Sequence, residues 1–84
     1  MTTENTRQTW AIRSTDDFGR TIADLRVQRG LTQEALARQG GISRNYLAQL
    51  ETGLTVALLD RVLRLLRRLD AEVTVSIRTR GDDA

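Results

Sequence analysis

Apolar positions follow a helical spacing over most of this chain. Phe18, Ile22 and Leu25 stand at i, i+4 and i+7 and predict one helix with a single buried stripe. Ser14 is suited to cap its start, with a carboxylate in the first turn, and Gly30 is suited to end it. The chain is therefore expected to be mainly helical.

Two shorter helical patterns follow and are joined by glycines. Thr32 can cap a helix over residues 33–39, whose inward positions are apolar, and Gly40-Gly41 then make a turn. Ser43 can cap a third helix, which stops near Gly53. The pattern predicts two short helices that meet at a tight turn.

Residues 54–57 form a short connection, interpreted as a helical turn begun by Thr55, and residues 58–69 return to a strong helical pattern. With that turn counted, five helices are expected. The apolar positions of the last helix are Leu59, Val62, Leu63, Leu66 and Leu69. Arg61, Arg64 and Arg68 lie together on another side, where a solvated face is favoured over a phosphate or partner site.

Residues 72–78 change to a period of two, which predicts a strand rich in β-branched residues. Val73, Val75 and Ile77 face one way. A lone strand needs a partner, either residues 9–13, where Trp10 and Ile12 share a side, or the same strand of a second copy. Trp10 is interpreted as a packing residue. Residues 9–78 are expected to form one domain, after a disordered 1–8 and before a polar tail at 79–84.

Composition limits the chemistry that this chain can support. It has 84 residues, enough for one small domain whose core is marginal, so dimerisation is an expected source of stability. It contains no cysteine and no histidine, which removes disulfides, the usual zinc ligands and the commonest general base. We therefore expect no enzyme, no metal and no cofactor. No apolar run reaches the roughly 20 residues of a membrane span, and no signal pattern opens the chain, so a cytoplasmic location is expected.

Positive charge gathers in the helical middle of the chain. All thirteen basic residues are arginine against eleven acids, a net charge of +2. Residues 20–53 carry +2 (five Arg, three acids) and residues 54–70 carry +2 (four Arg, two acids), whereas each end carries −1. This distribution permits nucleic-acid binding without demanding it.

The start of the third helix holds the residue types that read DNA bases. Arg44 can donate two hydrogen bonds to guanine, and Asn45 can bond adenine in both directions. Gln49 lies one turn further on, and Tyr46 suits a phosphate or a thymine methyl group. Residues at helix starts and polar residues next to them are expected to contact the phosphates of the DNA backbone. These residues are Thr32, Gln33, Arg38 and Ser43.

Residues 18–53 resemble the Cro/CI (Xre-type) helix-turn-helix family. Its pattern stands here as Leu31-Thr32-Gln33, Leu36-Ala37, Gly41, Ile42-Ser43 and Leu50-Glu51 before Gly53. The resemblance implies base reading after the Ser43 cap, phosphate contact by Gln33, and an ion pair between Arg26 and Glu51 that fixes the angle between helices. Two departures stand out: position 40 is glycine instead of an apolar residue, and residues 54–57 lack the basic residues or proline often found there.

The helix-to-strand passage over residues 65–75 is similar to that of HipB-type antitoxins, which accompany HipA-type serine/threonine kinase toxins. That resemblance implies a homodimer in which the C-terminal strands, with Val73, Val75 and Ile77, form a small shared sheet. It implies a repressor that binds a palindromic operator at its own promoter and also binds a kinase toxin. Two other functions remain open. One is a free-standing repressor without a toxin, and the other is a protein-interaction adaptor that has lost DNA binding and uses residues 54–58 and the helix after them.

Overall fold

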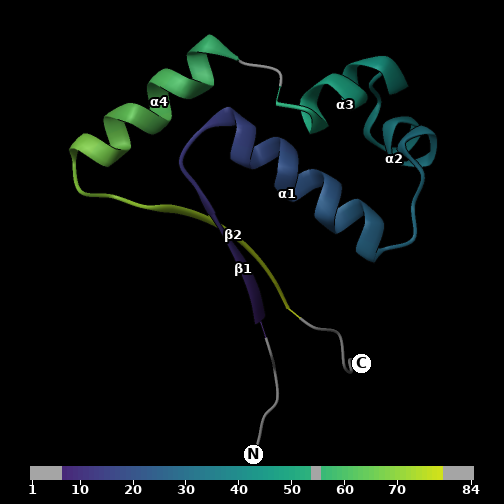
Figure 1. Ribbon diagram of the computed structural model, residues 1–84, viewed down its shortest axis with the longest axis horizontal. Coiled ribbons are helices and arrows are strands. Elements are labelled where there is room, and N and C mark those ends of the chain that lie inside the picture. The colour runs from purple at the N-terminus through teal and green to yellow at the C-terminus, as the bar shows by residue number, and fades with distance from the viewer. Residues whose placement is uncertain (1–6, 54–55, 79–84) are drawn as a thin grey trace, which may run out of the picture.

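The computed structural model describes residues 7–53 and 56–78, in which four helices and two strands form (Figure 1). Their order is β1 (Arg7–Ile12), α1 (Thr15–Gln28), α2 (Gln33–Gly40), α3 (Arg44–Glu51), α4 (Ala57–Arg68) and β2 (Val73–Arg78). The long α1 lies centrally, with the α2–α3 pair towards one end, α4 towards the other, and the two strands alongside (Figure 1). The predicted mainly helical chain with a strand after its last helix is confirmed.

Several boundaries differ from the prediction; Gly40, expected in the turn, is the last residue of α2. The expected fifth helix fell on residues 54–57, of which 54 and 55 lie outside the described residues, while Val56 is the N-cap of α4 and Ala57 its first residue. The described residues therefore contain four helices and not five. Arg7 and Gln8, expected to be disordered, belong to β1, because the ladder with β2 extends to Arg7.

The C-terminal strand finds its partner within the same chain. β1 and β2 run antiparallel in register from Arg7↔Arg78 to Ile12↔Val73. Of the two pairings considered, the one with the N-terminal segment is found, and the expected sheet shared across a dimer is wrong for these residues. Both strands alternate apolar and polar residues, and Trp10 lies opposite Val75. This register places the apolar residues of both strands on one face of the sheet, which favours their pairing.

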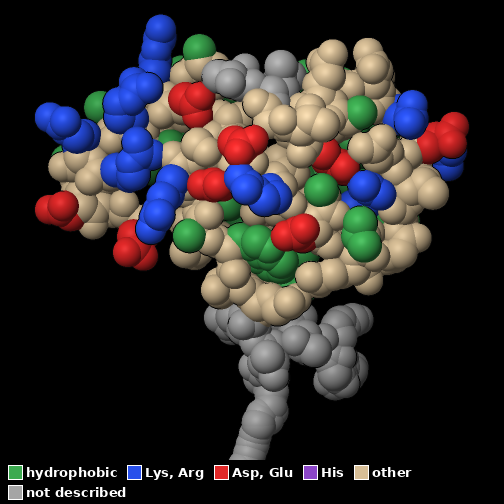
Figure 2. All heavy atoms as spheres, viewed as in Figure 1, with side chains coloured by type: hydrophobic (Ala, Val, Ile, Leu, Met, Phe, Trp, Pro, Cys, Tyr) green, Lys and Arg blue, Asp and Glu red, His purple; other side chains and the backbone are tan. Residues whose placement is uncertain are grey.

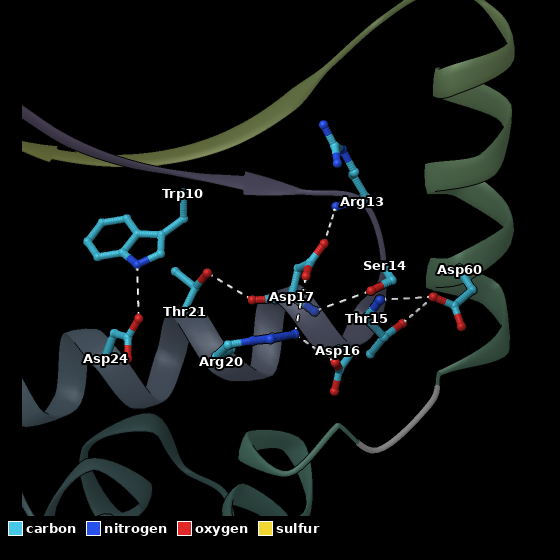
Figure 3. Close-up of polar contacts among 10 residues, drawn as sticks. All are labelled: Trp10, Arg13, Ser14, Thr15, Asp16, Asp17, Arg20, Thr21, Asp24 and Asp60. Carbon is cyan, nitrogen blue, oxygen red and sulfur yellow. Dashed lines mark hydrogen bonds and ion pairs between the residues drawn. The ribbon is translucent and has the colours of Figure 1, made fainter.

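That apolar face, which includes Val73, Val75 and Ile77, is half-buried, whereas Thr9, Ala11, Thr74 and Ser76 on the other face are exposed. A polar contact also ties β1 to α1, because the indole Nε1 of Trp10 donates to Asp24 Oδ2 at 3.1 Å (Figure 3). Trp10, which is half-buried, thus joins the sheet to the helix.

The side chains of Ser14, Asp17 and Asp60 accept hydrogen bonds at the N-terminus of α1. Ser14 Oγ accepts from the backbone N–H of Asp17 at 3.3 Å, and the Asp17 carboxylate accepts from the N–H of Arg13 at 2.7 Å (Figure 3). Asp60 of α4 accepts from both the N–H and the hydroxyl of the buried Thr15, at 2.9 and 2.7 Å. These bonds satisfy N–H groups that a helix start leaves free, and they join α4 to α1.

The same contacts explain the acidity of Asp60. The Thr15 hydroxyl and then the Thr15 N–H, both donating to the carboxylate, hold the pKa of Asp60 below its ordinary value. Arg67 of α4 adds a hydrogen bond to the carbonyl oxygen of Arg13. Hydrogen bonds from the first and third turns of α4 therefore hold this helix against the start of α1.

A small apolar core lies among four of these elements. Its buried members are Ile12 of β1, Ala37 of α2, Leu47 of α3 and Leu63 of α4. Where α1 crosses α3, the buried Gly19 leaves no room for a side chain, because a Cβ there would lie 1.9 Å from the carbonyl oxygen of Leu50. Glycine at this position lets the two helix backbones approach closely.

We expect Gly19→Ala to destabilise the fold by about 1–3 kcal/mol or more, because the added methyl meets backbone that must move. Urea unfolding followed by circular dichroism measures this change. Gly40→Ala is the matched control: Gly40 also lies in a helix, nothing lies within 4 Å of the place its methyl group would take, and a neutral effect or a small gain is expected. Equal stability of the Gly19→Ala variant and the parent would contradict the close crossing.

Candidate nucleic-acid interface

The α2–α3 unit is built around a left-handed glycine. Gly41 has φ +74°, and the N–H of Ile42 donates to the carbonyl oxygen of Ala37 at 3.1 Å, which closes the end of α2. Only residues 41–43 separate the two helices, since Ser43 already caps α3 by accepting from the N–H of Tyr46 at 3.0 Å. The turn therefore fixes the direction in which α3 leaves α2.

One side of α3 is anchored and the other is open. Leu47 is buried and Leu50 half-buried against the rest of the domain. The four residues expected to read bases, by contrast, are all exposed in the free chain. These residues are Arg44, Asn45, Tyr46 and Gln49.

The N-terminus of α3 is also more positive than those of its neighbours. The first turns of the other helices contain carboxylates, namely those of Asp16 and Asp17, Glu34, and Asp60. The first turn of α3 contains no acid and begins with Arg44. Free N–H groups, the helix dipole and a guanidinium therefore act together at this surface, a combination that favours an anion.

The residues expected to contact the DNA backbone differ in their exposure and in their hydrogen bonds. Arg38 is exposed on α2, and Thr32 Oγ1 caps that helix by accepting from the N–H of Ala35 at 3.0 Å. The hydroxyls of Thr32 and Ser43 thus serve as cap acceptors, and each keeps its own O–H to donate. Gln33 is half-buried, and its Nε2 donates to Glu51 Oε1 at 2.9 Å. Gln33 consequently has a structural contact that its expected role did not include.

Arg26 and Glu51 come together in a two-pronged ion pair between α1 and α3. Arg26 Nε lies 2.7 Å from Glu51 Oε2, and Arg26 Nη2 lies 3.0 Å from Glu51 Oε1. The third nitrogen of Arg26, Nη1, donates to the carbonyl oxygen of Leu31 at 2.9 Å. The Glu51 side chain is only 5% exposed, so this pair is largely removed from water.

This environment shifts both ionisable groups towards their charged forms. Hydrogen bonding from Arg26 is the main cause that lowers the pKa of Glu51; burial opposes it, and the Gln33 amide lowers the pKa further. The same bond to Glu51 raises the pKa of Arg26. The pair is therefore charged at neutral pH.

Two structural features described above were not predicted from the sequence. Gly19 had a weak local signal, since an isolated glycine inside a helical pattern often has a packing reason. The bond from Thr15 to Asp60 had none, because the two residues are far apart in the chain and meet only through the fold. Among the described residues, no group of three acidic side chains is arranged to hold a metal ion.

The geometry defines a class: a small helical domain whose second short helix presents polar side chains beside a glycine turn, as DNA-binding domains do. Comparison with known families agrees, since residues 22–75 match the helix-turn-helix family. The match covers more than half of the chain, and this chain belongs to that family, of the Xre/Cro type. The family consists of DNA-binding domains and is typical of transcription regulators.

One curated relative is the signal transduction histidine-protein kinase/phosphatase UhpB of Salmonella typhimurium, 38% identical over 68 residues. The match covers 81% of this chain but only 13% of that relative. No solved structure matches the chain. Within the described residues, no helix is long and apolar enough to cross a membrane.

The lowered pKa of Glu51 predicts a stability that depends on pH. The stability that the ionised Glu51 contributes to the fold is fully present above the ordinary pKa of 4.5. It is lost as the pH falls through the lower pKa that Glu51 has in the folded state. We expect the free energy of unfolding to fall between about pH 6 and about pH 3, and Glu51→Gln to start lower and lose less over that range. Urea titrations across this pH range measure the free energy of unfolding of the parent and of the Glu51→Gln variant. The exposed Glu72→Gln is the control and should keep the parent profile; a parent-like profile for Glu51→Gln would contradict the role of the pair.

Proposed function

We propose that this protein is a sequence-specific DNA-binding repressor that inserts the start of α3 into the major groove. The observation that carries the proposal is the exposure of Arg44 and Asn45 at a helix start that is free of acids. Buried Leu47 and the ion pair of Glu51 hold that helix from its other side. Side chains that read bases need such a rigid mount, because small displacements break paired hydrogen bonds.

In this proposal the exposed residues of α3 have different roles. Arg44 suits guanine and Asn45 suits adenine, each through two hydrogen bonds. Gln49, one turn later and exposed, would reach a neighbouring base, and Tyr46 would contact a phosphate or a thymine methyl group. These contacts would supply sequence preference.

Contacts to the phosphate backbone would set the register on the duplex. Arg38 offers an exposed guanidinium, and the starts of α2 and α3, with Thr32 and Ser43, offer free N–H groups and hydroxyls. Gln33 has a second N–H beyond the one given to Glu51, and this could meet a phosphate while the first stays in place. Gln33 would then connect the backbone contact to the Arg26–Glu51 pair.

Such a domain is expected to act as a homodimer on a palindromic operator. Two copies of α3 spaced by one helical turn of DNA, about 34–36 Å, meet successive major grooves on one face. Doubling the contacts would provide the affinity that one small domain lacks.

The finer proposal is that the protein is the antitoxin of a two-gene operon, which represses its own promoter and binds a kinase toxin. It rests on the resemblance of the sequence over residues 65–75 to the helix-to-strand passage of HipB-type antitoxins. The free-standing repressor differs only in having no toxin. The adaptor alternative would use the same fold without binding DNA.

DNA binding should be salt-dependent and should depend on the identified side chains. We expect the affinity for a duplex from upstream of its own gene, measured by fluorescence anisotropy, to fall between two ionic strengths. Arg44→Ala or Asn45→Ala should each weaken operator binding by about 1–3 kcal/mol and relax base choice at one position. Arg68→Ala, an exposed arginine on α4, is the matched control and should bind like the parent.

The outcomes separate the alternatives. An absence of salt-dependent binding to any duplex would favour the adaptor. Equal loss on operator and scrambled DNA for Asn45→Ala would refute base reading while leaving phosphate contact intact.

The antitoxin proposal predicts a stable complex with the product of the adjacent gene. Co-expression of the two genes with a tag on the neighbour should yield both chains in one peak on gel filtration, and the complex should suppress the neighbour's kinase activity. Separate elution, or a neighbour without kinase activity, would favour the free-standing repressor.

A further inference from the structure

A hollow lies between the second half of α1 and helix α2. Its volume is about 340 Å³, and its apolar walls are the side chains of Ile22 and Leu25 of α1, Leu31 of the connecting loop and Leu36 of α2. All four residues are half-buried, so the domain forms the hollow but leaves it open to solvent. None of them belongs to the buried core, and the hollow is therefore a separate feature of the surface.

The size of this hollow suits a small molecule. Pockets that bind small ligands have volumes of about 300–1,000 Å³ and mostly apolar walls with a few polar groups at fixed places. Two other hollows in the described part of the chain have volumes of about 140 and 190 Å³ and fall below that range. At roughly 30 Å³ for each water-sized group, the hollow between α1 and α2 holds a ligand of about ten non-hydrogen atoms.

The polar groups that line the hollow select the charge of that ligand. They are the guanidinium groups of Arg26 and Arg29 and the amide of Gln39, and no carboxylate lines the hollow. All three nitrogens of Arg26 are already used, because they bind Glu51 and the carbonyl oxygen of Leu31. Arg29 is exposed and makes no ion pair with another described residue, so its guanidinium can donate two hydrogen bonds to a carboxylate.

The end of α1 does not reverse this preference. Arg29 is the C-cap of that helix, and its full positive charge exceeds the roughly half negative charge of a helix C-terminus. The mouth of the hollow therefore favours an anion.

The walls select the shape of the ligand. All the apolar residues that line the hollow are aliphatic, and Trp10, Phe18 and Tyr46 lie elsewhere. An aromatic ring would therefore find no aromatic side chain to pack against, whereas a flexible hydrocarbon chain can follow an open groove between two helices. A carboxylate on a chain of about eight carbons combines this shape with the required charge and size.

We propose that this hollow, here named the α1–α2 site, binds a medium-chain fatty carboxylate. Its carboxylate meets Arg29, and its hydrocarbon tail lies among the four aliphatic side chains. None of the residues expected to contact DNA lines the α1–α2 site. The proposal therefore goes beyond the repressor function, and ligand binding can be measured with no duplex present.

Calorimetric titration of the full chain with octanoate tests the class of ligand. We expect saturable binding of octanoate, weaker binding of 1-octanol, octylammonium and indole-3-acetate, and no binding of acetate. Octylammonium that binds more tightly than octanoate would overturn the proposal, as would octanoate that fails to bind below the concentration at which it aggregates. Indole-3-acetate that binds as tightly as octanoate would overturn the choice of an aliphatic tail.

Two pairs of variants test the named side chains. Arg29→Gln should weaken octanoate binding about three- to fivefold and leave 1-octanol binding unchanged, because only an exposed ion pair is lost. Arg64→Gln, which changes an exposed arginine of α4, is its control and should bind like the parent. Leu36→Trp should fill the site and abolish octanoate binding, whereas Val27→Trp, at an exposed position of α1 outside the site, should not.

Arg29→Gln changes only the surface, so it decides the outcome even where Leu36→Trp does not fold. Octanoate affinity equal to that of the parent in Arg29→Gln would overturn the proposed head-group contact. Octanoate binding by a folded Leu36→Trp variant would overturn the site itself.

An NMR titration locates the bound octanoate. The backbone amide signals of Ile22, Leu31 and Leu36 should shift as the ligand is added. The exposed apolar residues of α4, with the basic side chains that gather over that helix (Figure 2), offer similar contacts on an outward helix face. Shifts centred on Leu58 and Leu65 instead of the α1–α2 site would overturn the proposal. Octanoate binding by the Arg44→Ala variant, in which DNA binding is expected to weaken, would separate this result from the repressor proposal.

Discussion

The position of α3 depends on the ion pair that Glu51 makes with Arg26. Burying a carboxylate is unfavourable unless its oxygens are satisfied, and here both oxygens accept from Arg26 while Gln33 adds a further bond to one of them. Because Arg26 also binds the carbonyl oxygen of Leu31, a single guanidinium joins α1, α3 and the loop before α2. The pair therefore fixes geometry as much as it adds stability.

Close packing supplies the second constraint on the same helix. Gly19 brings the backbone of α1 against the end of α3 near Leu50, and Leu47 inserts into the small core. With one side held in this way, α3 has no freedom to turn Asn45 inwards. The exposed polar start of α3 is thus a consequence of how its opposite side is anchored, and the proposed DNA interface follows from that anchoring.

The far end of the molecule is organised differently. α4 is held to the start of α1 by polar contacts, chiefly those of Asp60 with Thr15 (Figure 3). Its Leu63 is buried. Its apolar surface is wider than the area the domain covers, which leaves Leu58, Leu65 and their neighbours in water. One chain therefore carries an anchored helix for the proposed DNA contact and, at its other end, a helix that the domain covers on one side only.

The amino-acid sequence by itself determined the four helices of the described residues, the caps at Ser14, Thr32 and Ser43, and the polar start of α3, because spacing, capping residues and Gly41 act over one or two turns. It also indicated a strand over residues 72–78, which the structure places at Val73–Arg78. Tertiary structure alone decided which partner this strand takes, that Asp60 closes the start of α1, and that Leu65 stays exposed. These outcomes depend on contacts between segments distant in the chain, and local periodicity carries no information about which of two apolar faces the fold will cover.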